Sequence, residues 1–390
     1  MRLGVIGYGG RIGGMVHKFR ALAHDLRVVG IVDPDEEGAR ARLDESDRDQ
    51  AQFYPSVDAL VRQGRPDALA IGTRCNLHAP YAIQVARYDL PLFLEKPVAI
   101  NMRQARALER AFADSRCQVV VSFPLRVSPL CELAREYVRD GAVGESVHVA
   151  ATNYVPYGTV YWEAKYRDYA VTQGLFLQKA THDFDYLAYL MGSPIVRIAA
   201  MATWDKVFGG DKPSGLVCSE CGERETCLES DLNRSRNATT GSHADHPCVY
   251  SVDCGNPDQG RNEDCSSALL QFASGAHGVY TQVFYARGEA GRRGAAVSGH
   301  LGTVEFDWID NQLRRVRHHA PFTATERAGG ELSHFGGDGE LARNFVDVIA
   351  GRATSRTPIS AGIDSVYACL AAKESSEKGR FAKVRRVGQA

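Results

Sequence analysis

The sequence predicts a two-domain α/β protein, in which a parallel, doubly wound sheet is followed by an α+β domain with a large, mainly antiparallel sheet. A length of 390 residues exceeds one ordinary hydrophobic core and favours two domains. Short apolar runs alternate with helical patterns in the first third, which is typical of repeated βα units. Longer segments of alternating polarity follow, as expected for a sheet with one covered face. We therefore expect domains at 1–122 and 123–390.

Five apolar runs predict the parallel strands of the first domain, since the helical pattern between each pair supplies the crossover that parallel strands need. These runs are 3–6, 28–32, 68–71, 92–94 and 119–121. Six segments predict strands of the second sheet. These segments are 147–153, 195–204, 268–272, 278–285, 295–298 and 303–306. A polar, cysteine-rich insertion is expected at 205–262, and a C-terminal helical region at 339–378.

The charge balance limits the possible partners. The chain has 46 Lys and Arg residues against 47 Asp and Glu, which argues against a broad cationic surface for nucleic acid or anionic lipid. The sequence shows no apolar run long enough to span a membrane and no N-terminal pattern of a secretory signal peptide. We therefore expect a cytoplasmic location. The expected partners are a small-molecule substrate and further copies of the chain, joined through the second sheet.

A glycine-rich turn follows the first predicted strand. It reads Gly7-Tyr8-Gly9-Gly10-Arg11-Ile12-Gly13 and leads into a helical pattern. Glycines at the first two positions permit a tight turn and bring backbone N–H groups close to a pyrophosphate at a helix N-terminus. The third glycine of G-x-G-x-x-G would fall at Ile12, so the match is incomplete. Residues 7–12 are therefore candidate contacts of a dinucleotide in a Rossmann domain.

Asp33 ends the second predicted strand, where an acid hydrogen-bonds the adenosine ribose hydroxyl of a dinucleotide. The same carboxylate repels a 2′-phosphate. The expected cofactor is therefore NAD in preference to NADP.

Further along, Glu95-Lys96-Pro97 follows the strand at 92–94, and Thr73, Asn76 and His78 lie in the loop upstream. With the glycine-rich start, this motif resembles the Gfo/Idh/MocA oxidoreductases over nearly the whole chain. The resemblance implies that Lys96 lies beside nicotinamide and substrate. It also implies that further residues contact the cofactor, namely Thr73, Asn76, His78, Glu95 and Arg126.

The segment Thr181-His182-Asp183 opens a predicted helix and resembles the family segment that carries a catalytic histidine. His182 would accept a hydroxyl proton, and Lys96 would stabilise negative charge on the reacting oxygen. Many members have an aspartate where this chain has Gln178, which cannot relay a proton. The neighbouring Lys179 would lower nearby pKa values, hold an anionic group, or point into solvent.

The insertion contains Cys218-x2-Cys221-x5-Cys227 followed by Cys248, a spacing and ligand count typical of a structural tetrathiolate zinc site. It also resembles the cysteine-bearing branch of the family. Few apolar residues are present, so a metal would supply folding free energy. The alternatives for the fourth ligand are His243, His246, Cys254 and Cys265.

Aromatic and cationic residues are candidates for substrate binding. Tyr154, Tyr157, Tyr161 and Trp162 precede the histidine segment, and aromatic rings stack on the apolar faces of sugars. Cations that pair with an acid group predict an anionic sugar as substrate. They are Arg126, Lys179, Arg287, Arg292 and Arg293. The predicted substrate shell is completed by Lys96, Gln178, His182 and His334.

Three functions remain open from the sequence. The first is an NAD-dependent dehydrogenase that moves a hydride to or from a ring hydroxyl of a sugar or sugar acid. The second is an NAD-dependent glycosidase that acts on an anionic, for example sulfonated, glycoside by transient oxidation, elimination and water addition. The third is a protein that binds NAD and sugar without turnover, which is disfavoured because Lys96 and His182 are both present.

Overall fold

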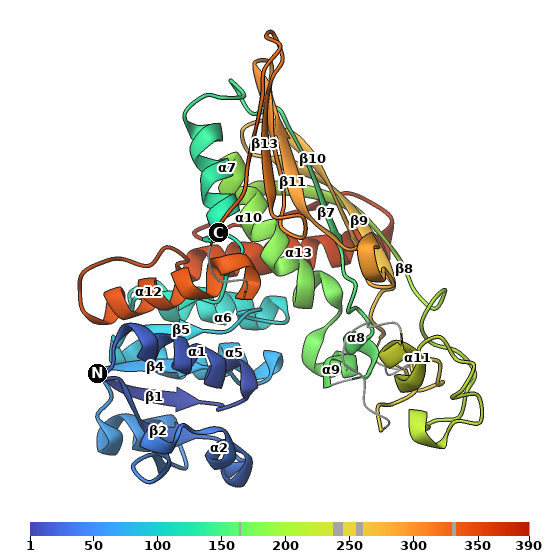
Figure 1. Ribbon diagram of the computed structural model, residues 1–390. Coiled ribbons are helices and arrows are strands. Elements are labelled where there is room, and N and C mark those ends of the chain that lie inside the picture. The colour runs from blue at the N-terminus through green and yellow to red at the C-terminus, as the bar shows by residue number, and fades with distance from the viewer. Residues whose placement is uncertain (164, 237–244, 255–259, 330–332, 390) are drawn as a thin grey trace.

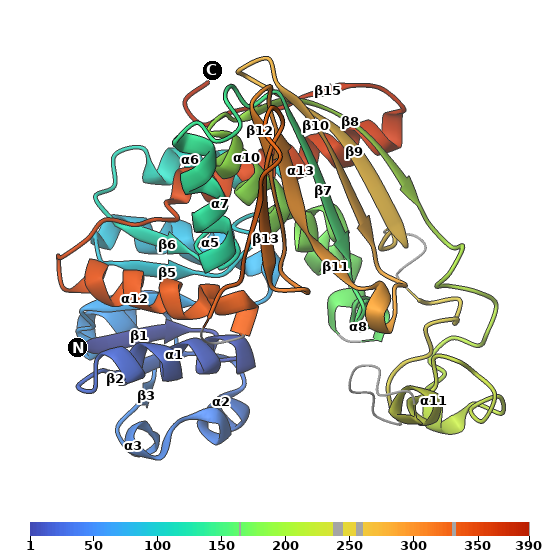
Figure 2. The ribbon, with the colours of Figure 1, turned by 45° about the horizontal axis from the view of Figure 1, so that its top comes forward.

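The computed structural model describes all residues except 164, 237–244, 255–259, 330–332 and 390. Two sheets form its framework (Figures 1 and 2). The first has six strands in the order β3-β2-β1-β4-β5-β6, and the second has nine in the order β14-β13-β12-β11-β7-β10-β9-β8-β15. This arrangement confirms the predicted fold class. In the part of the chain that is described, none of the helices is long and apolar enough to cross a membrane.

The first sheet is entirely parallel. Its strands are β1 (Arg2–Ile6), β2 (Arg27–Val32), β3 (Gln52–Phe53), β4 (Ala68–Ile71), β5 (Leu92–Leu94) and β6 (Val119–Val121). The strands β4, β5 and β6 are buried at every position, because helices cover both faces of the sheet. All five predicted strands are present, and the sequence analysis missed only the two-residue edge strand β3.

Helices from both ends of the sequence cover this sheet (Figure 1). Those of the N-terminal part are α1 (Gly10–Leu22), α2 (Glu36–Arg42), α3 (Glu45–Arg48), α4 (Val57–Ala59), α5 (Cys75–Val85) and α6 (Met102–Phe112). The C-terminal helix α12 (Gly337–Ile349) packs beside α1, and Phe345 lies 4.9 Å from Phe19 and 5.6 Å from Phe93 between ring centroids. The first core therefore includes a helix that the expected division at residue 122 assigns to the second domain.

The second sheet is antiparallel except for the central pair of β7 and β10. Its strands are β7 (His148–Tyr154), β8 (Ile195–Thr203), β9 (Cys265–Phe272), β10 (His277–Val283), β11 (Arg292–Ser298), β12 (Gly302–Asp307), β13 (Gln312–Arg317), β14 (Thr323–Glu326) and β15 (Ala382–Lys383). Arg292 and Arg293 belong to β11, which begins three residues before the predicted strand at 295–298. The strands β13, β14 and β15 were not predicted, because their polar sequences lack a clear apolar alternation.

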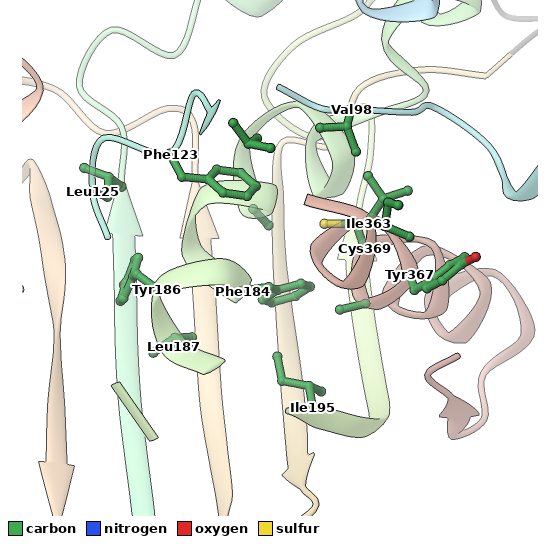
Figure 3. Packing of buried hydrophobic residues seen from close by; sticks show 14 of the residues in the cluster. Val98, Phe123, Leu125, Phe184, Tyr186, Leu187, Ile195, Ile363, Tyr367 and Cys369 are labelled. Atoms are coloured by element: carbon green, nitrogen blue, oxygen red, sulfur yellow. The ribbon is translucent and has the colours of Figure 1, made fainter. Parts of the chain in front are cut away.

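One face of the second sheet is covered by α7 (Pro129–Arg139), α10 (Thr181–Met191) and α13 (Ile359–Lys378) (Figure 2). Phe184 of α10 points into the space between Ile195 and Ile363 in this core (Figure 3), and Leu187 belongs to the same cluster. The other face carries exposed apolar side chains such as Met201, which is 79 % exposed. The predicted self-association through this sheet remains a prediction.

The cysteine-rich insertion has its own small core. Phe208 and Val249 from the insertion pack with Trp162 and Phe284, and the rings of Trp162 and Phe208 are 4.2 Å apart. Buried Arg234 adds ion pairs with Glu163 and Glu229. The remaining helices in this part are α8 (Val160–Glu163), α9 (Tyr169–Thr172) and α11 (Asp231–Arg236). The core of the insertion therefore includes aromatic rings from residues outside the insertion.

A glycine directly after a neighbouring strand compensates for the incomplete glycine-rich turn. Ile12 is fully buried at the start of α1, where the third glycine of the motif would allow close packing of helix on sheet. Gly72 follows β4 directly opposite, and a Cβ atom at Gly72 would lie 1.8 Å from Ile12 Cγ1. The space that the motif usually gains on the helix is thus gained on the strand.

We expect Gly72→Ala to lower the free energy of unfolding by about 1–3 kcal/mol, because the added methyl group overpacks this contact. The double variant Gly72→Ala/Ile12→Ala should recover most of that loss relative to Ile12→Ala alone. Urea denaturation of the four proteins of this cycle measures the coupling. Strictly additive effects would show that the two residues do not share the space.

Candidate active site

Lys96 lies at the carboxyl edge of the first sheet, directly after β5. Its Nζ donates a hydrogen bond of 2.8 Å to the backbone carbonyl of Gln178, which belongs to the second domain. Burial, together with the nearby cations Lys179 and Arg293, lowers the pKa of Lys96 to about 8. The ammonium group therefore bridges the two domains and can lose its proton near neutrality.

His182 lies in the first turn of α10, four residues after Gln178. Its side chain is 6 % exposed, packs edge-on against Phe123, and leaves Nδ1 without a hydrogen-bond partner among the described residues. Burial, and then the positive charges of Lys96 and Arg293, hold its pKa well below the ordinary histidine value. His182 is consequently a neutral imidazole, the form that can accept a proton.

The next residue, Asp183, ties this segment to the second sheet. Its buried carboxylate accepts hydrogen bonds from Arg293 at 2.9 to 3.1 Å, from Asn153 at 3.0 Å and from Tyr280 at 2.9 Å. The three donors come from the neighbouring strands β11, β7 and β10. Because the helix is fixed at this point, the position of His182 relative to the sheet is fixed as well.

Lys179 points toward the site and not into solvent. It is 5 % exposed, and its Nζ lies 2.6 Å from the hydroxyl of Tyr157 and 4.8 Å from the centroid of that ring. The side chain of Gln178 turns away and accepts a hydrogen bond of 3.2 Å from Cys75 Sγ. The sequence analysis named Tyr157 only as one of several aromatic residues, because nothing in the sequence indicates contact between residues 157 and 179.

The glycine-rich turn has the form expected of a dinucleotide cradle. Gly7 adopts a φ of +80°, and a Cβ there would lie 2.7 Å from the backbone of Thr73. Beside Gly10 the space is open, and the start of α1 has no side-chain cap. The N–H groups of this first turn are therefore available to a pyrophosphate. Asp33 accepts hydrogen bonds from the N–H groups of Tyr8 and Asp35 at 2.7 and 2.9 Å.

Three other residues expected at the cofactor differ in how they are placed. The ring of Tyr8 is buried beneath α1, so only its backbone faces the turn. His78 is buried between the carbonyls of Pro97 and Thr73, at 2.8 and 3.0 Å, and joins the two loops. Asn76 has a buried Oδ1 with no partner in the described part of the chain, which leaves it available to a ligand.

A chain of ion pairs joins the turn to α12. Arg11 binds Glu95 at 2.9 Å and Asp338 at 2.7 Å, and Asp338 also accepts from His334 Nδ1 at 2.8 Å. Although burial opposes ionisation, the hydrogen bonds from Arg11 and His334 hold the pKa of Asp338 well below its usual range. His334 lies near enough to add to the field that lowers the pKa of His182.

The structure does not bring the remaining candidates into this site. Arg126 is paired with Asp185 of α10 at 2.6 and 2.9 Å. Three further residues also lie elsewhere. Trp162 is buried in the core of the insertion, Tyr154 lies on the face of β7 opposite the one that carries Asn153, and Arg292 is exposed. A further arginine, Arg287, binds Glu229 of the insertion at 2.7 Å.

The zinc prediction finds no support in the structure. Across the described residues, no three His, Cys, Asp or Glu side chains are placed so that they could hold a metal ion. The four thiols, of Cys218, Cys221, Cys227 and Cys248, are free, and Cys218 donates to Asp231 at 3.3 Å. The contacts that hold the described part of the insertion include its aromatic core and the ion pairs of Arg234. His243 lies outside the described residues.

This geometry defines a dinucleotide-dependent enzyme with a lysine and a histidine at the domain junction. Two family models match the chain: the oxidoreductase family with an NAD-binding Rossmann fold over residues 1–123, and the GFO/IDH/MocA C-terminal domain over residues 131–305. The chain therefore belongs to the Gfo/Idh/MocA oxidoreductase family, as its motifs predicted. The family model also agrees with the predicted NAD cofactor.

Curated relatives include the inositol 2-dehydrogenase of Rhizobium meliloti (strain 1021), which is 28 % identical over 62 % of this chain and 70 % of its own length. The myo-inositol 2-dehydrogenase of Thermotoga maritima is 25 % identical over 51 % of this chain and 58 % of its own. The levoglucosan dehydrogenase of Pseudarthrobacter phenanthrenivorans is 28 % identical over 38 % of this chain. The chain spans only 42 % of the last relative.

Solved structures share the fold at low sequence identity. An oxidoreductase domain protein from Kribbella flavida matches with a TM-score of 0.77 and 18 % identity over 98 % of this chain and 99 % of its own. A levoglucosan dehydrogenase in complex with NADH and levoglucosan matches with a TM-score of 0.74 and 17 % identity, over 99 % of this chain and 100 % of its own.

We expect Arg293→Met to lower the free energy of unfolding by about 3–5 kcal/mol, because it leaves the buried carboxylate of Asp183 without its charge partner. Arg314→Met is the matched control. It breaks a largely exposed pair with Glu305, so it should cost about 1 kcal/mol or less. Urea denaturation measures both changes, and equal losses would contradict the role given to Arg293.

Proposed function

We propose that the chain is an NAD-dependent dehydrogenase that moves a hydride between the cofactor and a ring hydroxyl carbon of a sugar or sugar acid. One observation carries the proposal. The Lys96 ammonium, at the carboxyl edge of the Rossmann sheet, binds the carbonyl of Gln178. The neutral imidazole of His182 lies four residues further along that segment, near enough for the charge of Lys96 to lower its pKa. The names of the dehydrogenase relatives support the sugar as substrate.

Each residue of the site has a separate role in the proposed reaction. Bound NAD would supply the hydride acceptor for the hydroxyl carbon. His182 would take the hydroxyl proton, since its imidazole is uncharged and its Nδ1 has no hydrogen-bond partner among the described residues. Lys96 donates a hydrogen bond to the same oxygen and stabilises the negative charge that develops there. The backbone of residues 7–12 would hold the pyrophosphate, and Asp33 favours NAD over NADP.

An anionic substrate is part of the proposal, but it rests on fewer cations than the sequence indicated. Arg126, Arg287 and Arg293 already have carboxylate partners. Lys179 forms no salt bridge with a described residue and lies beside Lys96 in the site. A carboxylate or sulfonate on the sugar would satisfy this buried ammonium group.

The redox-neutral glycosidase is the second candidate. That reaction needs a proton-transfer group in addition to His182, and the contact between Lys179 and Tyr157 offers one. Aglycone release from an aryl glycoside without net NADH would favour it over the dehydrogenase.

Substitution of Lys96 or of His182 tests the proposed function. Lys96→Met and His182→Ala should each lower kcat/KM by about 10²–10⁴, because each removes a group that acts on the reacting oxygen. Lys383→Met and His277→Ala are controls at exposed positions of the second sheet. Initial rates of NADH formation measure the effect. A rate near that of the wild type in either site variant would place the chemistry elsewhere.

The pH dependence follows from the same two groups. Lys96 has a pKa lowered to about 8, so its ammonium donor is present below that pH and is lost above it. His182 stays neutral throughout this range. We expect kcat/KM for hydroxyl oxidation to fall about tenfold per pH unit above pH 8, as measured in a constant-ionic-strength buffer series. A continued rise above pH 8 would contradict the donor role of Lys96.

A panel of acidic and neutral sugars tests whether the site prefers an anionic substrate. We expect glucuronate to be oxidised with a higher kcat/KM than myo-inositol or levoglucosan. Lys179→Met should reduce the ratio of acidic to neutral kcat/KM by about tenfold or more, since a charge-assisted hydrogen bond contributes about 1.5–3 kcal/mol. An unchanged ratio, with neutral sugars preferred, would remove the anionic substrate while leaving the dehydrogenase intact.

A further inference from the structure

His182 must lose its proton again before each new turnover. In the proposed dehydrogenase reaction it accepts a hydroxyl proton, and the imidazolium that results is buried beside Lys96 and Arg293, whose positive charges disfavour it. The neighbouring carboxylate of Asp183 is already occupied by hydrogen bonds from donors on three strands. Gln178, four residues before His182, carries an amide that does not ionise. The proton therefore needs another route out of the site.

His334 lies in the turn before α12 and joins the site to solvent. Its positive charge would add to those that lower the pKa of His182, so the two imidazoles lie within reach of each other's field. The side chain of His334 is 43 % exposed, whereas His182 is buried. Its Nδ1 lies 2.8 Å from Oδ2 of Asp338, and Nε2 has no hydrogen-bond partner in the described part of the chain. Nε2 is therefore available to exchange protons with water.

The charged groups around His334 differ in sign from those around His182. Asp338 is buried, and both of its oxygens accept hydrogen bonds of 2.7 Å from Arg11. Arg11 also binds Glu95 at 2.9 Å. One guanidinium thus faces two carboxylates, and the cluster becomes neutral when His334 carries a proton. A proton that moves from His182 to His334 leaves a group of cations and enters a group with an uncompensated negative charge.

The backbone of this turn is held in a conformation that is unusual for residues other than glycine. His334 has a φ of +43° and Phe335 a φ of +56°. The ring of Phe335 stacks on Trp308 at 5.7 Å with an angle of 16° between the ring planes, and Trp308 Nε1 donates a hydrogen bond of 2.9 Å to Ser128. Strained backbone persists only where the surrounding contacts fix it, and it is concentrated at functional sites. These contacts hold His334 against Asp338.

We propose that His334 is the group through which the hydroxyl proton leaves the site after it has passed to His182. This inference rests on the proposed function. The substrate O–H bond breaks and an N–H bond forms on His182. That N–H bond then breaks, a bridging water passes a proton to Nε2 of His334, and bulk water removes it, so that His182 is neutral again. Asp338 is the positioning residue of this route, since it holds Nδ1.

His334→Asn tests the route, because asparagine can keep the hydrogen bond to Asp338 but cannot carry a proton. The NAD-saturated enzyme is mixed rapidly with glucuronate, myo-inositol or levoglucosan at low buffer concentration, and NADH absorbance is followed. We expect the first turnover to keep its wild-type rate and kcat to fall about tenfold or more, since His182 can accept one proton but loses it slowly. His319→Asn is the matched control, an exposed histidine that is also hydrogen-bonded through one ring nitrogen.

Rescue by a mobile base separates proton transfer from a structural role. Added imidazole should restore kcat of His334→Asn in proportion to its concentration, and it should leave the wild type and His319→Asn unchanged. An unchanged kcat in His334→Asn, or a loss of activity that imidazole does not restore, overturns the proton route and leaves the dehydrogenase standing. Rescue of Tyr157→Phe in place of His334→Asn also overturns it, because the proton would then leave through the phenol.

A second measurement needs no substrate. The ring N–H of neutral His182 exchanges its hydrogen with water, and nuclear magnetic resonance of the full chain, labelled with nitrogen-15 in its histidines, gives the rate. We expect this rate to be about tenfold lower in His334→Asn than in His319→Asn. Equal rates in the two variants overturn the proton route. If none of the three sugars reduces NAD, the proposed function fails, and the exchange rate still decides whether His334 connects His182 to water.

Discussion

The buried carboxylate of Asp183 is the constraint on which the site depends. A charge with no solvent contact must be paired and hydrogen-bonded, and Asp183 meets this requirement with donors from three neighbouring strands. Because Asp183 follows His182, the strands of the second sheet determine where the imidazole lies. Glu263 fixes the same segment from its other end, where its carboxylate accepts the N–H groups of Leu175 and Phe176. The segment that carries the proposed chemistry is thus held at both ends by buried carboxylates.

Electrostatics in the site follow from placing several cations where little water reaches them. Burial disfavours the charged forms of Lys96, Lys179 and His182 at once, and each charge that remains opposes the others. His182 is consequently neutral, and Lys96 and Lys179 release their protons more readily than a surface lysine. The same field favours the anionic form of Tyr157. An anionic ligand, a phenolate and a developing alkoxide are all stabilised by this excess of positive charge, which links the proposed substrate to the proposed acid–base groups.

The insertion shows how a polar segment is stabilised by residues outside it. Its own sequence has few apolar side chains, but Trp162 and Phe284 give Phe208 and Val249 a surface on which to pack. Arg287 and Glu163, outside the insertion, complete its ion pairs with Glu229 and Arg234. Tyr161 and Trp162, which the sequence predicted as sugar-binding residues, thus pack in this core. Val155 and Tyr161, on either side of Tyr157, belong to this core, so the insertion packs against the segment that carries Tyr157.

The sequence by itself determined the fold class, the parallel strands and the positions of Lys96 and His182, because these depend on local periodicity and on motifs whose residues are adjacent. It also indicated the glycine-rich turn, although Ile12 departed from the motif. Only the tertiary structure showed that Gly72 provides the missing space and that α12 covers the first sheet. It also showed that Arg126, Arg287 and Arg293 are neutralised by carboxylates, and that Lys179 meets Tyr157. The physical reason is the same in each case. Whether a charge is free, a ring exposed or a glycine necessary depends on neighbours that lie tens or hundreds of residues away in the chain.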